Sequence, residues 1–216
     1  MISTISEWLS NHWIETTAAI LGTIYLILSI RQHIGLWFFG LLTSALYIYV
    51  FLAEKFYADM ALQVYYVVIS IYGWIHWKYG KTNTDKLPVT SCGIRLFYVL
   101  TLSWLILWVA MSAFLKYFTD SPVPIGDGFT TAGSIVATWM LARKIKEHWI
   151  FWVIIDFVSL ALYVNKGLYP TSILFAVYTI MAVVGYIEWT KDYKTRPMKQ
   201  ILTKHGLQSK DLNLNH

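Results

Sequence analysis

The chain has 216 residues, of which 57% are hydrophobic, 17% aromatic and 13% charged, so it is too apolar for an ordinary soluble domain, a disordered chain, a coiled coil or a collagen. Its single cysteine, Cys92, cannot build an intramolecular disulfide framework, and no Cys/His spacing indicates a metal site.

Seven membrane-spanning helices are predicted, because apolar runs of about 17 to 22 residues recur with only short polar breaks. In chain order they cover Trp13–Ile30, Ile34–Ala53, Ala58–Trp77, Ile94–Leu115, Val123–Leu141, Trp149–Val164 and Pro170–Trp189. The fifth is the most polar, with Asp127 near its start, and a helix with a polar face is expected to border a bundle interior. No signal peptide is predicted in residues 1–12, which contain no Lys or Arg, so the first span is expected to stay in the mature protein.

The basic residues predict the orientation of the chain. Fourteen of the 17 lysines and arginines follow the first, third, fifth or last span, whereas Lys55, Lys116 and Lys166 lie on the other side. Basic loops stay in the cytoplasm, so the N-terminus is predicted outside and the C-terminus inside. The polar tail after Trp189 is predicted to be a cytoplasmic extension rather than a further domain.

An internal repeat is predicted, because residues 37–77 and 149–189 align without a gap. Their identical pairs include Trp37/Trp149, Phe39/Phe151, Tyr66/Tyr178, Gly73/Gly185 and Trp77/Trp189. Corresponding spans lie four apart and point the same way across the membrane, so the repeats are parallel. The fourth span then returns the chain to its starting side. This 3+1+3 plan is the SWEET-like arrangement of an all-α integral membrane protein, with a substrate site near the midplane.

The predicted organisation follows from these spans. It consists of a periplasmic N-terminus (1–12), a first three-helix repeat (13–77), a connector helix (94–116), a second three-helix repeat (123–189) and a cytoplasmic tail (190–216).

Asp156 is the one acid predicted well inside a span, where burying a carboxylate costs about 3 kcal/mol or more. Its helical neighbours Trp152, Ser159 and Tyr163 place an acid, a hydroxyl and aromatic rings on one helix face. We interpret Asp156 as functional; the alternative is a carboxylate that only ties helices together, which an uncharged residue would do at lower cost. Because no second acid or histidine completes a proton relay, we expect facilitated diffusion without obligatory ion coupling.

Other polar and aromatic side chains fall on helix faces that could wall a cavity. Gln63, Tyr66 and Ser70 share one stripe of the third span, and Thr43 and Ser44 form a patch on the second. The predicted substrate-binding residues are Asp156, Trp152, Gln63, Thr43, Ser44, Tyr66, Ser70, Trp149, Ser159, Tyr163 and Tyr178. Such a cavity suits a flat, polar ring compound, through stacking and cation–π contacts; ordinary aromatic packing is the alternative for each ring.

Other chemistry has little support in the sequence. A retinal protein would need a lysine inside the last span, the histidines form no paired ligand set, and a Gly-rich phosphate loop is absent. We therefore predict no cofactor, metal or catalytic residue, and the chain is not expected to be an enzyme.

Several short motifs carry a family resemblance. In the second half they are Trp-Ile-Phe-Trp (149–152), Ile-Ile-Asp (154–156), Lys-Gly-Leu-Tyr (166–169) and Gly-Tyr-Ile-Glu-Trp (185–189); in the first half, Phe-Gly-Leu (39–41), Ala-Leu-Gln (61–63) and Ile-Tyr-Gly-Trp (71–74). Over nearly its whole length, from about Trp13 to Trp189, the chain resembles the PnuC vitamin transporters.

The resemblance implies a facilitator of the bacterial inner membrane, usually for nicotinamide riboside, that works as a homotrimer and whose substrate a cytosolic kinase traps after entry. It places Gln63, Trp152 and position 156 at the site. Nicotinamide riboside members have Asn where this chain has Thr43 and Asp156, and related members carry thiamine, so a thiamine transporter stays open. A membrane receptor or channel is the remote alternative. The expected partners are the vitamin and membrane lipid, and not nucleic acid.

Overall fold

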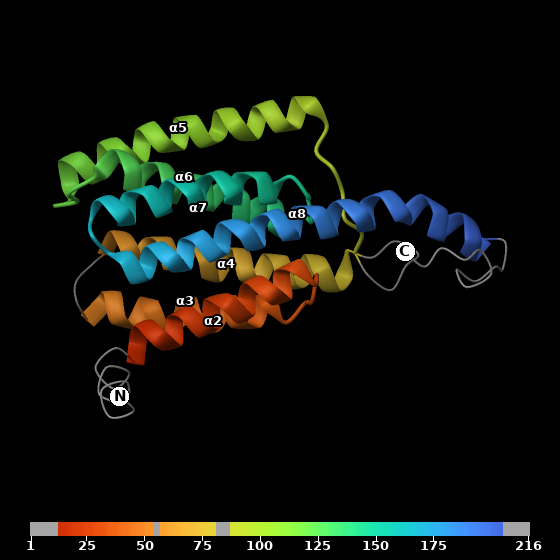
Figure 1. The fold of residues 1–216 in the computed structure, drawn as a ribbon, viewed down its shortest axis with the longest axis horizontal. Helices are drawn as coiled ribbons and strands as arrows, with labels where there is room; N and C mark the ends of the chain where they lie inside the picture. Colours follow the sequence, from red (N-terminus) through yellow and green to blue (C-terminus); the bar gives the residue numbers. More distant parts are fainter. Residues whose placement is uncertain (1–12, 54–56, 81–86, 205–216) are drawn as a thin grey trace.

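Seven α-helices make up the part of the chain that the computed structural model describes, residues 13–53, 57–80 and 87–204 (Figure 1). They are α2 (Trp13–Ile30), α3 (Leu36–Ala53), α4 (Tyr57–Tyr79), α5 (Ile94–Phe118), α6 (Pro124–Ala142), α7 (His148–Asn165) and α8 (Tyr169–Lys204). The predicted seven helices are confirmed. Beyond the predicted end of the last span at Trp189, α8 continues as a helix and extends past the rest of the bundle (Figure 1).

Local sequence explains where these helices begin and end. Pro124 occupies the first turn of α6, where its missing N–H leaves no intrahelical bond unmade. Gly167, with φ of 71°, follows the end of α7 in the left-handed conformation that glycine adopts without strain. Among the described residues, the helices long and apolar enough to cross a membrane are Ile94–Phe118, His148–Asn165 and Thr171–Thr195, with shorter apolar stretches at Ile20–Ile30 and Leu36–Tyr49.

Six of the helices close into a ring. α2 packs against α3 and α8, α3 against α4, α4 against α6, α6 against α7, and α7 against α8. The first and last described helices are therefore neighbours, although they are far apart in the sequence (Figure 1). We call α2–α4 the first triplet and α6–α8 the second triplet.

The fourth of the seven helices, α5, lies outside this ring and packs along α6 (Figure 1). Leu100 and Trp104 are its buried residues, and they face α6 and α7. The rest of its surface is apolar and exposed, including Tyr98, Leu102, Ile106 and Val109. A surface of this kind is stable against lipid or another subunit rather than water.

The two ends of the ring differ in their connections. At one end α2, α4 and α6 finish and α3 and α7 begin, and four buried tryptophans lie there, Trp37, Trp77, Trp149 and Trp189; we call this the tryptophan end. The linker after α4 is bound to the α6–α7 turn at this end: Thr90 N–H donates to the Lys144 carbonyl at 2.9 Å, and Lys146 N–H donates to the Thr90 carbonyl at 3.0 Å. The other end contains Asp127 and is called the opposite end.

Candidate functional site

A cavity of about 260 Å³ lies inside the ring. Five of the six ring helices contribute to its wall, so it opens between the two triplets rather than within one of them. Its lining residues are Leu21, Gly22 and Tyr25 of α2, Gly40, Thr43, Ser44 and Tyr47 of α3, Gln63, Tyr66 and Ser70 of α4, Thr138 of α6 and Trp152 of α7.

Six of the predicted substrate-binding residues line this cavity. They are Thr43, Ser44, Gln63, Tyr66, Ser70 and Trp152. The helical period explains the group on α4, because residues three and four apart share one face of a helix. The structure thus brings together one amide, four hydroxyls and two aromatic rings from three different helices.

The other five predicted residues lie outside the cavity lining. Asp156 is buried, with 6% of its surface exposed, one helical turn from Trp152 towards the opposite end. It interacts electrostatically with Tyr178, whose hydroxyl lies against the cavity-lining Gly22. Ser159 is buried one turn further along α7 than Asp156.

Tyr163 and Trp149 have packing partners of their own. The Tyr163 ring stacks on Phe175 at 5.1 Å, in the half of the ring towards the opposite end. Trp149 belongs to the tryptophan end, with its ring 5.9 Å from that of Trp189. The two tryptophans of the Trp149-x-x-Trp152 motif therefore have different places, since Trp152 lines the cavity and Trp149 is buried in the core at the tryptophan end.

Several cavity residues are not among the predicted substrate-binding residues. Gly22, Tyr25 and Gly40 gave no polar signal in an apolar run, and only the packing of α2 on α3 reveals them. Thr138 is a polar residue of the fifth predicted span, the most polar of the seven. It is 5% exposed and lines the cavity, as expected for a helix that borders a bundle interior.

Neutral groups dominate the chemistry of the cavity. None of its lining residues is Asp, Glu, Lys, Arg or His, and Asp156 is the nearby acid. The wall is fixed by hydrogen bonds between helices: the Tyr65 hydroxyl of α4 donates to the Ile135 carbonyl of α6 at 2.7 Å. Within the described ranges no group of three His, Cys, Asp or Glu side chains could hold a metal ion. The site can stack rings and bind polar neutral groups.

Aromatic rings fill the tryptophan end. The Trp37 and Trp77 rings meet edge-on at 5.4 Å, Trp77 lies 6.3 Å from Trp189, and Trp189 meets Trp149 edge-on at 5.9 Å. Each of the four is at most 5% exposed. We call them the tryptophan cluster. Gly73 and Gly185 allow this packing, because a Cβ atom at either would lie within 3.0 Å of the Trp37 or Trp149 ring.

Next to the cluster, Glu147 in the α6–α7 turn binds the linker before α5. Its carboxylate accepts hydrogen bonds from the Ser91 hydroxyl at 2.5 Å and the Cys92 N–H at 3.0 Å. Burial raises the pKa of Glu147, but these bonds and Lys146 outweigh it and hold the pKa below its usual value. Burial and then the Glu147 charge raise the pKa of the Cys92 thiol to about 11.

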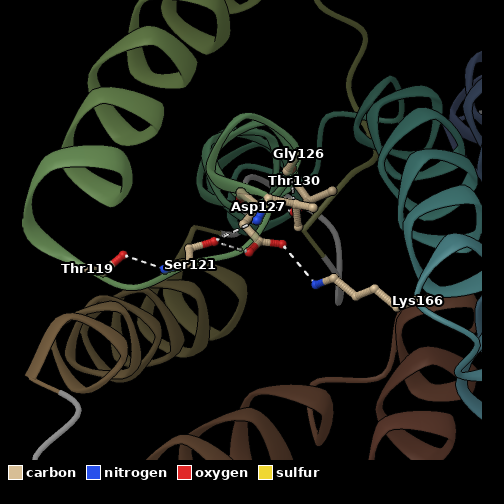
Figure 2. A network of polar contacts seen from close by, with 7 residues as sticks. Thr119, Ser121, Gly126, Asp127, Thr130 and Lys166 are labelled. Atoms are coloured by element: carbon tan, nitrogen blue, oxygen red, sulfur yellow. Dashed lines mark hydrogen bonds and ion pairs between the residues drawn. The ribbon is translucent and has the colours of Figure 1, made fainter.

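A smaller polar network lies at the opposite end (Figure 2). The Ser121 hydroxyl donates to the Asp127 carboxylate at 2.7 Å, and Lys166 forms an ion pair with the same carboxylate at 3.8 Å. Asp127 stands in the first turn of α6, where a negative charge also favours the helix dipole. This network joins α6 to the α7–α8 turn and so stays within the second triplet.

Known proteins of one family are similar to this chain. Residues 12–191 match the family model described as nicotinamide mononucleotide transporter. The nicotinamide riboside transporter PnuC of Escherichia coli (strain K12) is 25% identical over 209 residues, which cover 85% of this chain and 87% of that protein. The riboflavin/roseoflavin transporter RibM of Streptomyces davaonensis is 25% identical over 187 residues, covering 82% and 84%.

A solved structure has the same fold. The crystal structure of the vitamin B3 transporter PnuC matches with a TM-score of 0.69 at 23% identity, over 89% of this chain and 86% of that one.

Proposed function

Because this chain belongs to the nicotinamide mononucleotide transporter family, it is a multi-pass membrane transporter and not an enzyme, and we propose that it facilitates the uptake of nicotinamide riboside. The observation that carries this proposal is the cavity, which combines aromatic rings with neutral hydrogen-bonding groups and has no ionised side chain in its lining. The uptake is facilitated diffusion, and a cytosolic kinase makes it unidirectional in the cell by consuming the substrate.

The size and chemistry of the cavity favour a single nucleoside. Pockets for drug-sized ligands measure about 300–1,000 Å³, whereas this cavity has about 260 Å³. A pyridine ring can stack on Tyr25 or Trp152, and a carboxamide can pair with the Gln63 amide. No lysine or arginine lines the wall to pair with a phosphate, which favours a nucleoside over a nucleotide.

The substrate contacts in this proposal come from the six predicted residues that line the cavity, Thr43, Ser44, Gln63, Tyr66, Ser70 and Trp152. Asp156, Ser159, Tyr163 and Tyr178 belong to the route towards the opposite end, and Trp149 to the route towards the tryptophan end. A thiamine transporter is the second candidate, because Asp156 gives the route an acid that a cationic ring or an aminopyrimidine would bind.

We also propose that the two triplets are parallel repeats related by 112 residues, with α5 as the connector. Three observations support this. The starts of α3 and α7, and those of α4 and α8, are separated by this offset. Gln32 and Lys144, again at this offset, have the same φ of 54°. Finally, Trp37 covers Gly73 as Trp149 covers Gly185.

The orientation in this proposal puts the N-terminus outside and the tryptophan end in the cytoplasm of a bacterial inner membrane. It rests on the basic residues, which concentrate in the turns and the tail at this end. The exposed apolar face of α5 is available for lipid or for the neighbouring subunit of a homotrimer. Reporter fusions that place His216 outside the cell would contradict the orientation.

Uptake by the purified protein tests the function. Proteoliposomes containing only this protein should accumulate radiolabelled nicotinamide riboside to the outside concentration and no further, with or without an imposed proton or sodium gradient. Thiamine and riboflavin are measured in parallel. Uptake of thiamine without uptake of nicotinamide riboside would reverse our ranking of the two substrates. Uptake of none of the three compounds would refute the transport of vitamins of this class. Accumulation driven by an imposed gradient would refute facilitated diffusion.

The Asp156→Asn variant tests the role of the acid. It removes the charge and keeps the shape, so it should weaken binding by about 1–3 kcal/mol if the carboxylate contacts a cationic or donor group of the vitamin. Calorimetric titration with the vitamin that binds gives the affinity, and Asp120→Asn, the same substitution at an exposed position before α6, is the matched control. Unchanged affinity would make Asp156 a structural residue.

A further inference from the structure

The tryptophan cluster closes one end of the cavity. On α3, α4 and α7, the lining residue nearest this end lies three positions from a buried residue of the cluster or its packing, namely Trp37, Gly73 or Trp149. The Trp37 ring covers Gly73 and the Trp149 ring covers Gly185 without room for even one added carbon atom. A substrate that leaves the cavity in this direction has to displace the rings.

The hydrogen bonds of the cluster run between the triplets. The Trp77 indole N–H, on α4, donates to the Ala142 carbonyl at the end of α6, at 3.1 Å. The Trp189 indole N–H, on α8, donates to the Ser29 carbonyl near the end of α2, also at 3.1 Å. Both bonds cross from one triplet to the other, so separating the triplets at this end breaks both.

Lys144 adds a third connection between the halves. It lies in the α6–α7 turn and is 2% exposed. Its Nζ atom donates to the Gln32 side-chain oxygen at 3.1 Å and to the Leu87 carbonyl at 2.8 Å, and lies 4.4 Å from the centre of the Trp77 ring. Gln32 and Trp77 belong to the first triplet, and Leu87 to the linker that follows it.

The backbone at this connection is also unusual. Lys144 and Gln32 are the non-glycine residues with positive φ in the described part of the chain, both at 54°. An L-residue adopts this left-handed conformation only against a steric penalty, and such positions persist where surrounding contacts enforce them. Here local backbone bonds at the ends of α2 and α6 hold it, since His33 N–H donates to the Leu28 carbonyl at 2.8 Å and Ile145 N–H to the Met140 carbonyl at 3.0 Å. The two left-handed residues then meet through their side chains across the boundary between the triplets.

We propose that Lys144 is the latch of a gate formed by the tryptophan cluster. While its ammonium group binds Gln32 and Leu87, the triplets stay together and the cavity is closed at the tryptophan end. When these bonds break, the triplets separate there, the indoles part, and the cavity opens to that side of the membrane. This inference rests on the proposed transport function, because a gate matters only if a substrate passes.

Cysteine accessibility tests the latch without any substrate. In a Cys92→Ser background, Ser70→Cys places a thiol in the cavity wall next to the cluster. A membrane-impermeant maleimide is added outside two kinds of membrane vesicle, right-side-out and inside-out, so that in one of them it meets the tryptophan end of the protein. Lys144→Met keeps the stem on Trp77 but removes the ammonium, and Trp77→Phe removes the indole N–H but keeps a ring. Each should raise the labelling rate roughly tenfold, as expected when a buried charge-assisted or indole bond is lost.

Lys78→Met is the matched control, because Lys78 is exposed at the end of α4 and outside the latch. It should leave the labelling rate unchanged. Unchanged labelling rates in Trp77→Phe and in a monodisperse Lys144→Met protein would overturn the latch. Equal acceleration of labelling by Lys78→Met would overturn it too. If the Lys144→Met protein does not fold, the labelling rate of Trp77→Phe decides. The labelling rates test the latch, and vitamin uptake tests the proposed function. Either result can be negative while the other is positive, so the two proposals fail separately.

Discussion

The two ends of the helix ring are held together in different ways. At the tryptophan end, the indoles of Trp77 and Trp189 and the ammonium of Lys144 all bind across the boundary between the triplets. At the opposite end, the ion pair of Asp127 with Lys166 stays inside the second triplet, and both side chains are about one-third exposed (Figure 2). The bonds at the first end are mostly buried and cross between the triplets, and the ion pair at the second end is partly exposed and stays within one triplet.

This difference shows how the two halves of a helix ring can be bonded to each other more strongly at one end than at the other. Buried hydrogen bonds to a charged group are worth about 1.5–3 kcal/mol each, whereas an exposed ion pair contributes about 0–1 kcal/mol. The Asp127–Lys166 ion pair does not resist separation of the triplets, because it does not cross between them. Opening at the tryptophan end therefore has to break buried bonds between the triplets, whereas opening at the opposite end leaves this ion pair intact.

The largest effect is expected from adding a side chain at a glycine that packs against the tryptophan cluster. Gly185→Val should lower the free energy of unfolding by about 3 kcal/mol, because its Cβ would overlap the Trp149 ring and force the core apart. Thermal unfolding in detergent measures this. Gly93→Ala is the control, since a Cβ there meets no atom within 4 Å. Equal effects at the two positions would mean that the cluster is loosely packed.

A pair of lysine substitutions compares the ends directly. Lys144→Met should lower the free energy of unfolding by about 1–3 kcal/mol, because it removes the donor from the part-buried Gln32 oxygen and the buried Leu87 carbonyl. Lys166→Met at the opposite end should cost less than about 1 kcal/mol. Denaturation of both variants in the same detergent gives the difference. If Lys166→Met lowered the free energy of unfolding as much as Lys144→Met does, the bonds at the two ends would contribute equally to stability.

Acid should weaken the tryptophan end through Glu147. Its carboxyl pKa is lower in the folded protein than in the unfolded chain, so its stabilisation is complete above the usual glutamic acid pKa of about 4.3 and is lost as the pH falls through the folded value. The wild-type melting temperature should therefore fall as the pH is lowered below about 4.3, and fall less in Glu147→Gln. A parallel decline in both proteins would remove Glu147 as the cause.

The smallest expected effect is on the reactivity of Cys92. Its thiol pKa of about 11 predicts slow alkylation at neutral pH, with a rate that still rises above pH 9 because only the thiolate reacts. Glu147→Gln removes the neighbouring negative charge and should speed alkylation at a fixed pH. Maleimide labelling followed by mass spectrometry gives both rates. A rate that levels off near pH 8 would show that the linker is not held against Glu147.

Part of the candidate site could be read from the sequence because helical periodicity groups side chains on one face. Gln63, Tyr66 and Ser70 were predicted as a stripe and do line the cavity together. Periodicity failed for Trp149, which lies three residues from Trp152 yet packs in the tryptophan cluster. It also gave no signal for Gly22, which has no side chain to count and is a cavity residue through its neighbours.

The sequence by itself determined the seven helices and the family, because hydropathy is a local property of about 20 consecutive residues and the motifs are short. It could not determine the six-helix ring, the position of α5 outside it, or the placement of Asp156 beside the cavity rather than in its lining. Those features depend on the rotation of each helix about its axis and on its choice of neighbour. Both are set by packing between segments far apart in the chain, such as the glycines that admit Trp37 and Trp149, and one sequence contains no direct record of those contacts.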